Sequence, residues 1–220
     1  MNPTESLPLF PLPMAVLPGE VTALHIFESR YRDMLEACLD QPGTNGDFVM
    51  LFSEDDKSDE VGCAVEISKV LHEHEDGRYD ILVAGRERVR VLTRFQLHSY
   101  DSVKVEVCDD EEADWDETLA TEVYALHRQL LVACTGDEPA DAFYQERRNL
   151  SFPVAACSGF STEEKRRLLS FDHENERLAY VKGHLERMLP FMQRAVPLWK
   201  NILGTYSLTQ MAGGAESTEA

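Results

Sequence analysis

The first half of the chain alternates apolar and polar residues as β-strands do. Residues 102–108 have the sequence Ser-Val-Lys-Val-Glu-Val-Cys. In an extended segment this order places Val103, Val105 and Val107 on one face. Asp76–Gly77 is a typical hairpin-turn signal between two such segments. The pattern predicts strands over residues 48–52, 61–71, 79–92 and 102–108. One helix is predicted among them, over residues 30–39, where apolar side chains recur at helical spacing.

The second half changes to helical spacing. Leu119, Val123, Leu126 and Leu130 recur every three or four residues, which predicts an amphipathic helix. The predicted helical segments are residues 117–134, 139–149, a buried turn or short helix at 152–157, a helix opened by a capping box at 161–164, and a long helix from about residue 172. We therefore expect an α+β fold, with a β domain followed by a helical bundle.

Prolines mark both ends of the chain. The opening Leu-Pro-Leu-Phe-Pro-Leu of residues 7–12 and the turn Pro18–Gly19 confine the chain to edge strands and turns, because proline fixes φ and lacks a backbone donor. We therefore expect the first strands at the edge of the sheet. Pro190 and Pro197 are predicted to interrupt or kink the last helix.

A change of texture near residue 109 divides the chain. Residues 109–117 carry seven acidic side chains in nine positions, which is typical of a solvated linker. We predict a β subdomain over residues 1–108, an acidic linker over 109–117, a helical subdomain over 118–205 and a disordered tail over 206–220.

Composition narrows the class of protein. The chain has 220 residues, a net charge of −19 and no apolar run long enough to cross a membrane. The acidic balance disfavours phosphate backbones and anionic lipid. Without a signal-peptide pattern, a cytoplasmic location without membrane attachment is expected. The five cysteines stand singly and are predicted to be reduced core residues.

The opening residues also resemble a known family. Leu7-Pro-Leu-Phe-Pro-Leu12, Val16-Leu-Pro-Gly19 and Leu24-His-Ile-Phe-Glu28 followed by Arg30-Tyr31 are similar to the start of the Lon N-terminal, or Lon substrate-binding, domain. The resemblance covers roughly residues 5 to 203. It implies a six-stranded pseudo-barrel of the PUA-like type followed by a helical bundle.

Two catalytic modules of the Lon protease have no counterpart in the sequence. No Gly-x-x-x-x-Gly-Lys-Ser/Thr phosphate loop is present, and no serine and lysine fit a peptidase dyad. We therefore expect a stand-alone Lon-type domain, without ATP hydrolysis or proteolysis, that needs no cofactor.

Three groups of side chains are candidates for chemistry. His25, Glu28, Arg30 and Tyr31 cluster at a predicted strand-to-helix junction, but no nucleophile elbow accompanies them. There Glu28 and Arg30 are expected to cap and pair, while Ile26 and Phe27 pack in the core. The predicted strand from residue 79 carries a row of arginines, which are Arg86, Arg88, Arg90 and Arg94.

The arginine row allows two interpretations. Because PUA-like modules can bind RNA, the row could be a nucleic-acid surface, but Glu87 interrupts it and the whole-molecule charge opposes binding. We expect these arginines to pair with carboxylates or to contact the helical half. RNA binding is the less favoured reading.

Two further features carry weaker signals. His72 and His74, at a strand end with Glu75 or Asp76 nearby, lack a clear third ligand, so no metal site is predicted. Met188, Phe191 and Met192 add apolar surface near the end of the chain; core packing is favoured, and an exposed peptide groove is the alternative.

The leading hypothesis is a non-catalytic binding module. It would hold peptide, unfolded protein or a protein partner in a groove between barrel and helices. The alternatives are a small-molecule-binding or hydrolytic enzyme with a pocket at the same junction, and an RNA-binding module. No catalytic residue is predicted, and the candidate binding residues are His25, Glu28, Arg30, Tyr31, Arg86, Arg88, Met188, Phe191 and Met192.

Overall fold

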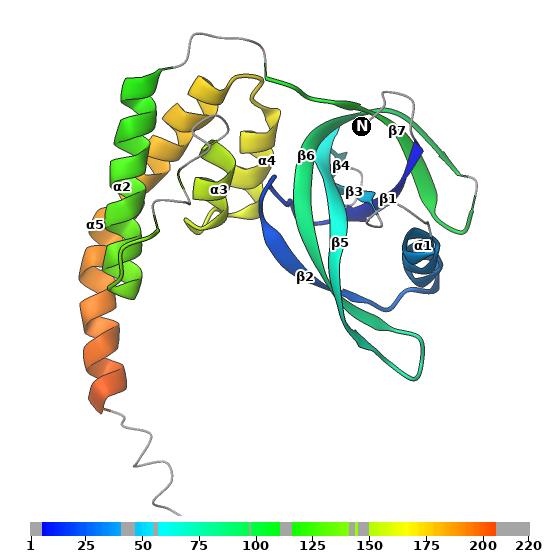
Figure 1. Ribbon diagram of the computed structural model, residues 1–220, viewed down its shortest axis with the longest axis horizontal. Helices are drawn as coiled ribbons and strands as arrows, with labels where there is room; N and C mark the ends of the chain where they lie inside the picture. The colour runs from blue at the N-terminus through cyan, green and yellow to red at the C-terminus, as the bar shows by residue number, and fades with distance from the viewer. Residues whose placement is uncertain are drawn as a thin grey trace, which may run out of the picture.

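A computed structural model describes residues 6–40, 47–54, 57–96, 98–110, 116–140, 144 and 150–205, with side chains as far as residue 198. The predicted α+β fold is confirmed. Figure 1 shows a β barrel on one side of the molecule and four helices on the other. We call β1–β7 with α1 the barrel, and α2–α5 the helical half.

The barrel is built from one sheet that closes on itself. Its strands are β1 (Ser6–Leu12), β2 (Val21–Ile26), β3 (Phe48–Glu54), β4 (Lys57–Ser58), β5 (Val61–Glu73), β6 (Tyr79–Gln96) and β7 (Asp101–Val107). The order is β1-β7-β6-β5-β3-β4, with β2 added to β6, and a parallel pairing of β1 with β3 closes the ring. Six strands were expected; the described residues add the two-residue strand β4.

The prediction that β1 lies at a sheet edge is wrong. Its residues 6–8 pair antiparallel with β7, and residues 9–12 pair parallel with β3. Each half of the strand therefore has one side without a strand partner, and there a proline that lacks an N–H donor is tolerated. The proline-rich opening closes the barrel instead of bordering it.

Strand β6 is the longest strand, and it carries the contact with the segment that follows β1. Its register against β5 shifts where Glu87 and Gly85 are successive partners, which leaves Arg86 as an extra residue. Gly85 exchanges backbone hydrogen bonds with Gly19 and Glu20. A β-carbon at Gly85 would lie 2.1 Å from the Leu17 carbonyl oxygen, so only glycine fits this close approach.

The helices begin close to where their local sequence predicts. They are α1 (Ser29–Leu39), α2 (Glu117–Thr135), α3 (Ser151–Ala156), α4 (Thr162–Ser170) and α5 (Glu174–Thr205). Helix α2 ends at Gly136, whose φ of 89° is the left-handed cap that glycine favours. Helix α4 begins with the predicted capping box between Ser161 and Glu164.

Helix α5 differs from its prediction. It continues through Pro190 and Pro197 as one helix, so of the two predicted effects, an interruption or a kink, the interruption is wrong. A proline in a helix removes one hydrogen bond, and packing of the preceding turns against α2 and α3 stabilises the helix around it. Most of the predicted helix at 139–149, much of the acidic stretch and the tail from residue 206 lie outside the described residues.

The segment between β1 and β2 joins the two halves. Val16 is buried in the barrel core with Tyr31, while Ala15 and Leu17 are buried in the core of the helical half. Adjacent side chains of this extended segment point to opposite sides, so one face belongs to each core. The opening of the chain therefore fixes the helical half against the barrel.

Candidate functional site

The nine predicted binding residues do not form one site. Those of the strand-to-helix junction lie on β2 and α1, the two arginines lie on β6, and the three apolar residues lie on α5. We describe each group where the structure places it.

The strand-to-helix junction is a structural contact. Glu28 and Arg30 form an exposed ion pair at 2.9 Å, but Glu28 makes no side-chain capping hydrogen bond. Tyr31 is buried against Phe10, and burial raises its pKa. Phe27 is 62% exposed, so the prediction that it packs in the core is wrong. A turning backbone between β2 and α1 points this ring to solvent.

His25 belongs to a different neighbourhood. Its Nδ1 lies 2.6 Å from a carboxylate oxygen of Asp80 on β6, and the other oxygen of Asp80 lies 2.8 Å from Nε2 of His74. The hydrogen bonds and nearby charges of the two imidazoles lower the pKa of Asp80, which is therefore ionised at neutral pH. The sequence did not place these three residues together.

The arginine row is paired with carboxylates. Arg86 reaches Glu66 at 2.6 Å, Arg90 lies 3.8 Å from Asp172, and Arg94 pairs with Asp101. These pairs leave little of the row's positive charge for a phosphate backbone.

Arg88 is the exception to the row, because it is 4% exposed. Its guanidinium donates to the carbonyl oxygens of Leu169, at 3.1 Å, and Phe171 at the end of α4. The alternation of the sequence places Arg88 on the arginine face, away from Val89, yet both are buried because the helical half covers that face of β6. Arg88 holds the two halves together and is closed to a ligand.

A second buried arginine extends this contact. Arg177 of α5 is fully buried and donates to Glu174 at 2.8 Å, to Ser151 at 3.1 Å and to Asp110. The Glu174 carboxylate also accepts from the Ser151 backbone N–H at 2.9 Å and from its hydroxyl at 2.6 Å. Every one of these charges is compensated, so the barrel–helix junction at this level is a closed polar contact.

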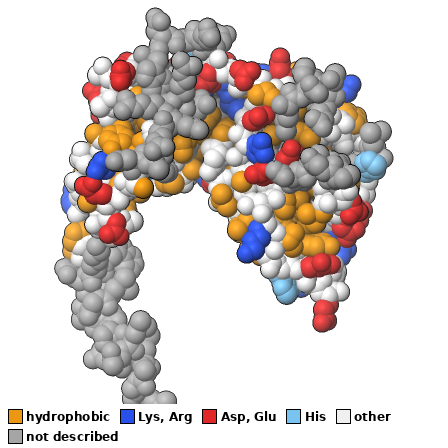
Figure 2. All heavy atoms as spheres, viewed as in Figure 1, with side chains coloured by type: hydrophobic (Ala, Val, Ile, Leu, Met, Phe, Trp, Pro, Cys, Tyr) orange, Lys and Arg blue, Asp and Glu red, His pale blue; other side chains and the backbone are white. Residues whose placement is uncertain are grey.

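The outer part of the junction is open but charged. Arg166 of α4 forms a two-pronged ion pair with Asp59 at 2.7 Å and stacks on Phe52. The hollow beside it has a volume of about 550 Å³. On the face drawn in Figure 2, a broad notch separates the helical half from the barrel. The lining residues are Ser58, Asp59, Glu60, Val61, Arg90, Glu163, Arg166, Arg167 and Ser170. The sequence analysis expected an apolar groove at the junction, but the lining of this hollow is mostly charged.

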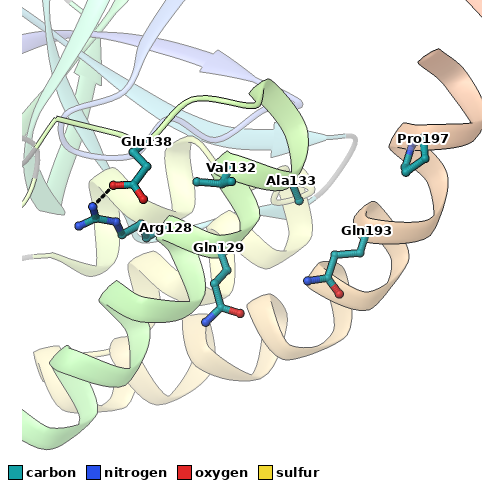
Figure 3. A pocket seen from close by; sticks show the side chains of 7 residues that line it. All are labelled: Arg128, Gln129, Val132, Ala133, Glu138, Gln193 and Pro197. Carbon is teal, nitrogen blue, oxygen red and sulfur yellow. Dashed lines mark hydrogen bonds and ion pairs between the residues drawn. The ribbon is translucent and has the colours of Figure 1, made fainter.

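An open groove with a mainly apolar surface lies elsewhere, between the end of α2 and the second half of α5. Figure 3 shows side chains of both helices around it, with an ion pair between Arg128 and Glu138 at its rim. Its volume is about 540 Å³, and its lining residues are Arg128, Gln129, Val132, Ala133, Glu138, Gln193 and Pro197. We call this the α2–α5 groove.

The three predicted residues of α5 lie close to this groove in sequence but do not line it. Met188 and Met192 are partly buried against the core of the helical half, whereas Phe191 is 57% exposed. Leu198 on the same helix is 63% exposed. The end of α5 thus combines core packing with exposed apolar surface, where the sequence favoured core packing.

Four of the five cysteines have raised thiol pKa values. Burial raises the pKa of Cys38 and of Cys63 to about 12, and it also raises the pKa of Cys108 and of Cys157. A catalytic thiol requires the opposite shift. Cys157 is exposed, so the prediction that all five lie in the core is wrong for this residue.

The comparisons with known proteins agree with this architecture. The model of the ATP-dependent protease La (LON) substrate-binding domain family matches residues 6–187. The chain belongs to this family. The family is described as a substrate-binding domain, so the chain is a substrate-binding module.

Two solved structures show the fold of the family. A Lon N-terminal domain protein from Xanthomonas campestris is 24% identical, with a TM-score of 0.60 over 80% of this chain and 95% of that chain. The N-terminal domain of a Mycobacterium avium complex Lon protease is 18% identical, with a TM-score of 0.60 over 83% of this chain and 98% of that one. Among the described residues of the present member, no helix is long and apolar enough to span a membrane.

Sequence reasoning missed the residues that make the α2–α5 groove. Val132 follows the apolar stripe of α2 by two positions, and Gln193 follows the stripe of α5, so neither stood out by type or spacing. No signal in the sequence marks these residues, because the groove depends on how α2 and α5 lie beside each other.

Proposed function

We propose that the protein is a non-catalytic binding module that holds extended or unfolded polypeptide in the α2–α5 groove. Membership of a substrate-binding domain family supports binding of protein substrates in general. The observation that carries the choice of site is the open, mainly apolar groove beside the exposed Val132. Unfolded chains expose apolar side chains that a folded protein buries, so an apolar groove discriminates in their favour.

The junction hollow is the weaker site for such a ligand. Arg90 and Arg166 of this hollow are already paired with carboxylates, and an extended apolar segment would have to desolvate them without replacing those bonds. The groove offers apolar surface at Val132, Ala133 and Pro197, and its one ion pair among the described lining residues, between Arg128 and Glu138, lies at the rim.

Binding is tested with a fluorescently labelled polypeptide that has been reduced and alkylated so that it stays unfolded. Fluorescence anisotropy of the wild-type protein is expected to show saturable binding. Val132→Glu should weaken binding about tenfold, because a charge would be desolvated in the groove. Gln193→Leu should tighten it about threefold, because it adds apolar contact area.

The matched control is Leu92→Glu, which changes another exposed apolar residue, on β6. It should leave the affinity unchanged. Equal affinities for wild type, Val132→Glu and Gln193→Leu would remove the groove as the site, and absence of any binding would remove the proposed function. Circular dichroism of each variant checks that the fold is retained.

A further inference from the structure

Three side chains from three separate parts of the barrel converge at one end of the sheet. They are His25 of β2, His74 in the turn after β5, and Asp80 near the start of β6. Asp80 is the backbone partner of His25 in the β2–β6 ladder, so the sheet itself holds the two side by side. One donor atom from each residue lies within 4.8 Å of the other two.

The cluster is rigidly supported but open to solvent. The β5–β6 hairpin closes with a hydrogen bond from the His74 N–H to the Arg78 carbonyl at 2.8 Å, and its turn residue Gly77 has a φ of 80°. The side chains of His25, His74 and Asp80 are 43%, 28% and 37% exposed. A fourth ligand from solvent can therefore reach the three donor atoms.

We propose that His25, His74 and Asp80 form a binding site for a divalent transition-metal ion of the Zn²⁺ class. Two imidazole nitrogens and one carboxylate oxygen are a donor set that zinc accepts, and three protein ligands leave one position for water. Nothing in this assignment depends on the proposed polypeptide binding, since the cluster lies on the barrel and the groove on the helical half.

The distances fit such an ion after a small adjustment. Ligand atoms on a tetrahedral zinc ion lie about 3.3 Å apart, given bonds of roughly 2 Å. The nitrogen–oxygen distances of 2.6 and 2.8 Å run to different oxygens of Asp80 and would each widen by about half an ångström on binding. The set of three donor atoms, one from each residue and all within 4.8 Å of one another, would draw together around the ion. Partly exposed side chains at a strand end can make this movement without disturbing the core.

The hydrogen bonds of Asp80 with the two histidines add little to the free energy of folding. Exposed pairs of this kind contribute only about 0–1 kcal/mol to folding. An ionised Asp80 can only accept hydrogen bonds, so these two contacts are made with Nδ1–H of His25 and Nε2–H of His74 as the donors. When a metal binds, each neutral ring carries its proton on the other nitrogen, and the cation takes the place of the two N–H groups.

The charge of the surroundings favours a cation. Glu73, Glu75 and Asp76 flank His74 in the hairpin; Arg78 pairs with the Asp76 carboxylate at 2.8 Å, and Arg32 donates to the Asp76 carbonyl at 2.7 Å. The net charge of −19 adds an attractive long-range field. The sequence analysis weighed a metal site only at His72 and His74. The cluster of His25, His74 and Asp80 could not be found that way, because His25 lies on β2 and Asp80 on β6.

The test is isothermal titration calorimetry of ZnCl₂ into protein without a histidine tag that has been stripped with a chelator. Wild type should bind one equivalent, and His25→Asn, His74→Asn and Asp80→Asn should each weaken binding by at least about tenfold. His98→Asn is the matched control, since His98 is an exposed histidine on the β6–β7 turn that stacks on Tyr100 outside the cluster. It should leave the affinity unchanged.

A spectrum of the Co²⁺ form identifies the donor atoms. A d–d spectrum of nitrogen and oxygen ligands that disappears in His74→Asn supports the site. A thiolate-to-cobalt charge-transfer band would assign the ion to a cysteine and overturn the proposal. Two other results would overturn the proposal. One is stoichiometric Zn²⁺ binding that none of the three cluster variants weakens, and the other is a wild-type protein that binds Zn²⁺ no more tightly than His74→Asn does.

Discussion

The barrel–helix junction and the α2–α5 groove are two places where a ligand could lie between secondary structure elements, and they are built in opposite ways. At the junction, buried Arg88 and Arg177 bind backbone carbonyls and carboxylates across the two halves. At the groove, helix surfaces separate and leave Val132 and Pro197 beside an open space. The junction has paired its buried charges, and the groove has unburied apolar surface.

This difference distinguishes a contact that stabilises the fold from a surface that can bind a ligand. A closed network of charges gains nothing from a ligand, because any new contact must first break an existing one. Apolar surface gains free energy whenever it is covered. A family resemblance alone pointed to the junction, and the chemistry of the two places points to the groove.

Removing the central arginine of the junction tests this contrast most strongly. Arg177→Met should lower the free energy of unfolding by about 3–5 kcal/mol, because it leaves buried Glu174 without its partner charge. Burial already raises the pKa of Glu174 against the opposing effects of Ser151 and Arg177. Urea unfolding followed by circular dichroism measures the change.

Two further variants show whether the buried charge is the cause. Arg86→Met, which breaks the exposed pair with Glu66, should cost less than about 1 kcal/mol. Adding Glu174→Gln to Arg177→Met should recover part of the lost stability, since the uncompensated charge is gone. Equal costs for Arg177→Met and Arg86→Met would contradict the description of the junction.

The helical half under the groove should respond to acid through His127. This side chain is fully buried in α2 beside Tyr144, and burial lowers its pKa to about 4. Between about pH 6.5 and pH 4 the unfolded chain binds a proton that the folded chain excludes, so stability falls as the pH falls. The loss approaches about 3 kcal/mol at the acid end of this window.

Comparison with His127→Gln isolates that contribution. Carboxylates also titrate in this range, but they do so in both proteins, so the difference between the two unfolding curves reports on position 127. Wild type should lose more stability than the variant on acidification. Parallel pH profiles for the two proteins would show that His127 is protonated in the folded state.

Most of the fold could be predicted from the sequence because its signals are local. Alternation identified β7, and apolar spacing identified α2 within a residue at each end. The position of β1 could not be predicted, because its partners β3 and β7 are distant in sequence. Proline restricted how the strand pairs but not with which strands.

The candidate sites were harder to predict because they depend on contacts between elements. Arg88 looks like a surface residue in an alternating strand, and only the helices packed over β6 show that it is buried. The groove exists because α2 and α5 separate toward their ends, which no residue type encodes. His25 did stand out by type, but its partner Asp80 is 55 residues away.

The smallest expected effect concerns the helix that carries the junction's outer ion pairs. Ser161 caps α4 by accepting from the Glu164 N–H at 3.3 Å, and Glu164 in turn lies 3.0 Å from His184 of α5. Ser161→Ala should cost about 1 kcal/mol in urea unfolding, because the cap's acceptor is lost. Thr162→Ala should change stability by less than about 0.5 kcal/mol, since this hydroxyl makes no hydrogen bond among the described residues. If Ser161→Ala leaves polypeptide binding unchanged, the junction stabilises the fold and the groove is the binding surface. A loss of binding that matches the loss of stability would show that binding in the groove depends on the junction.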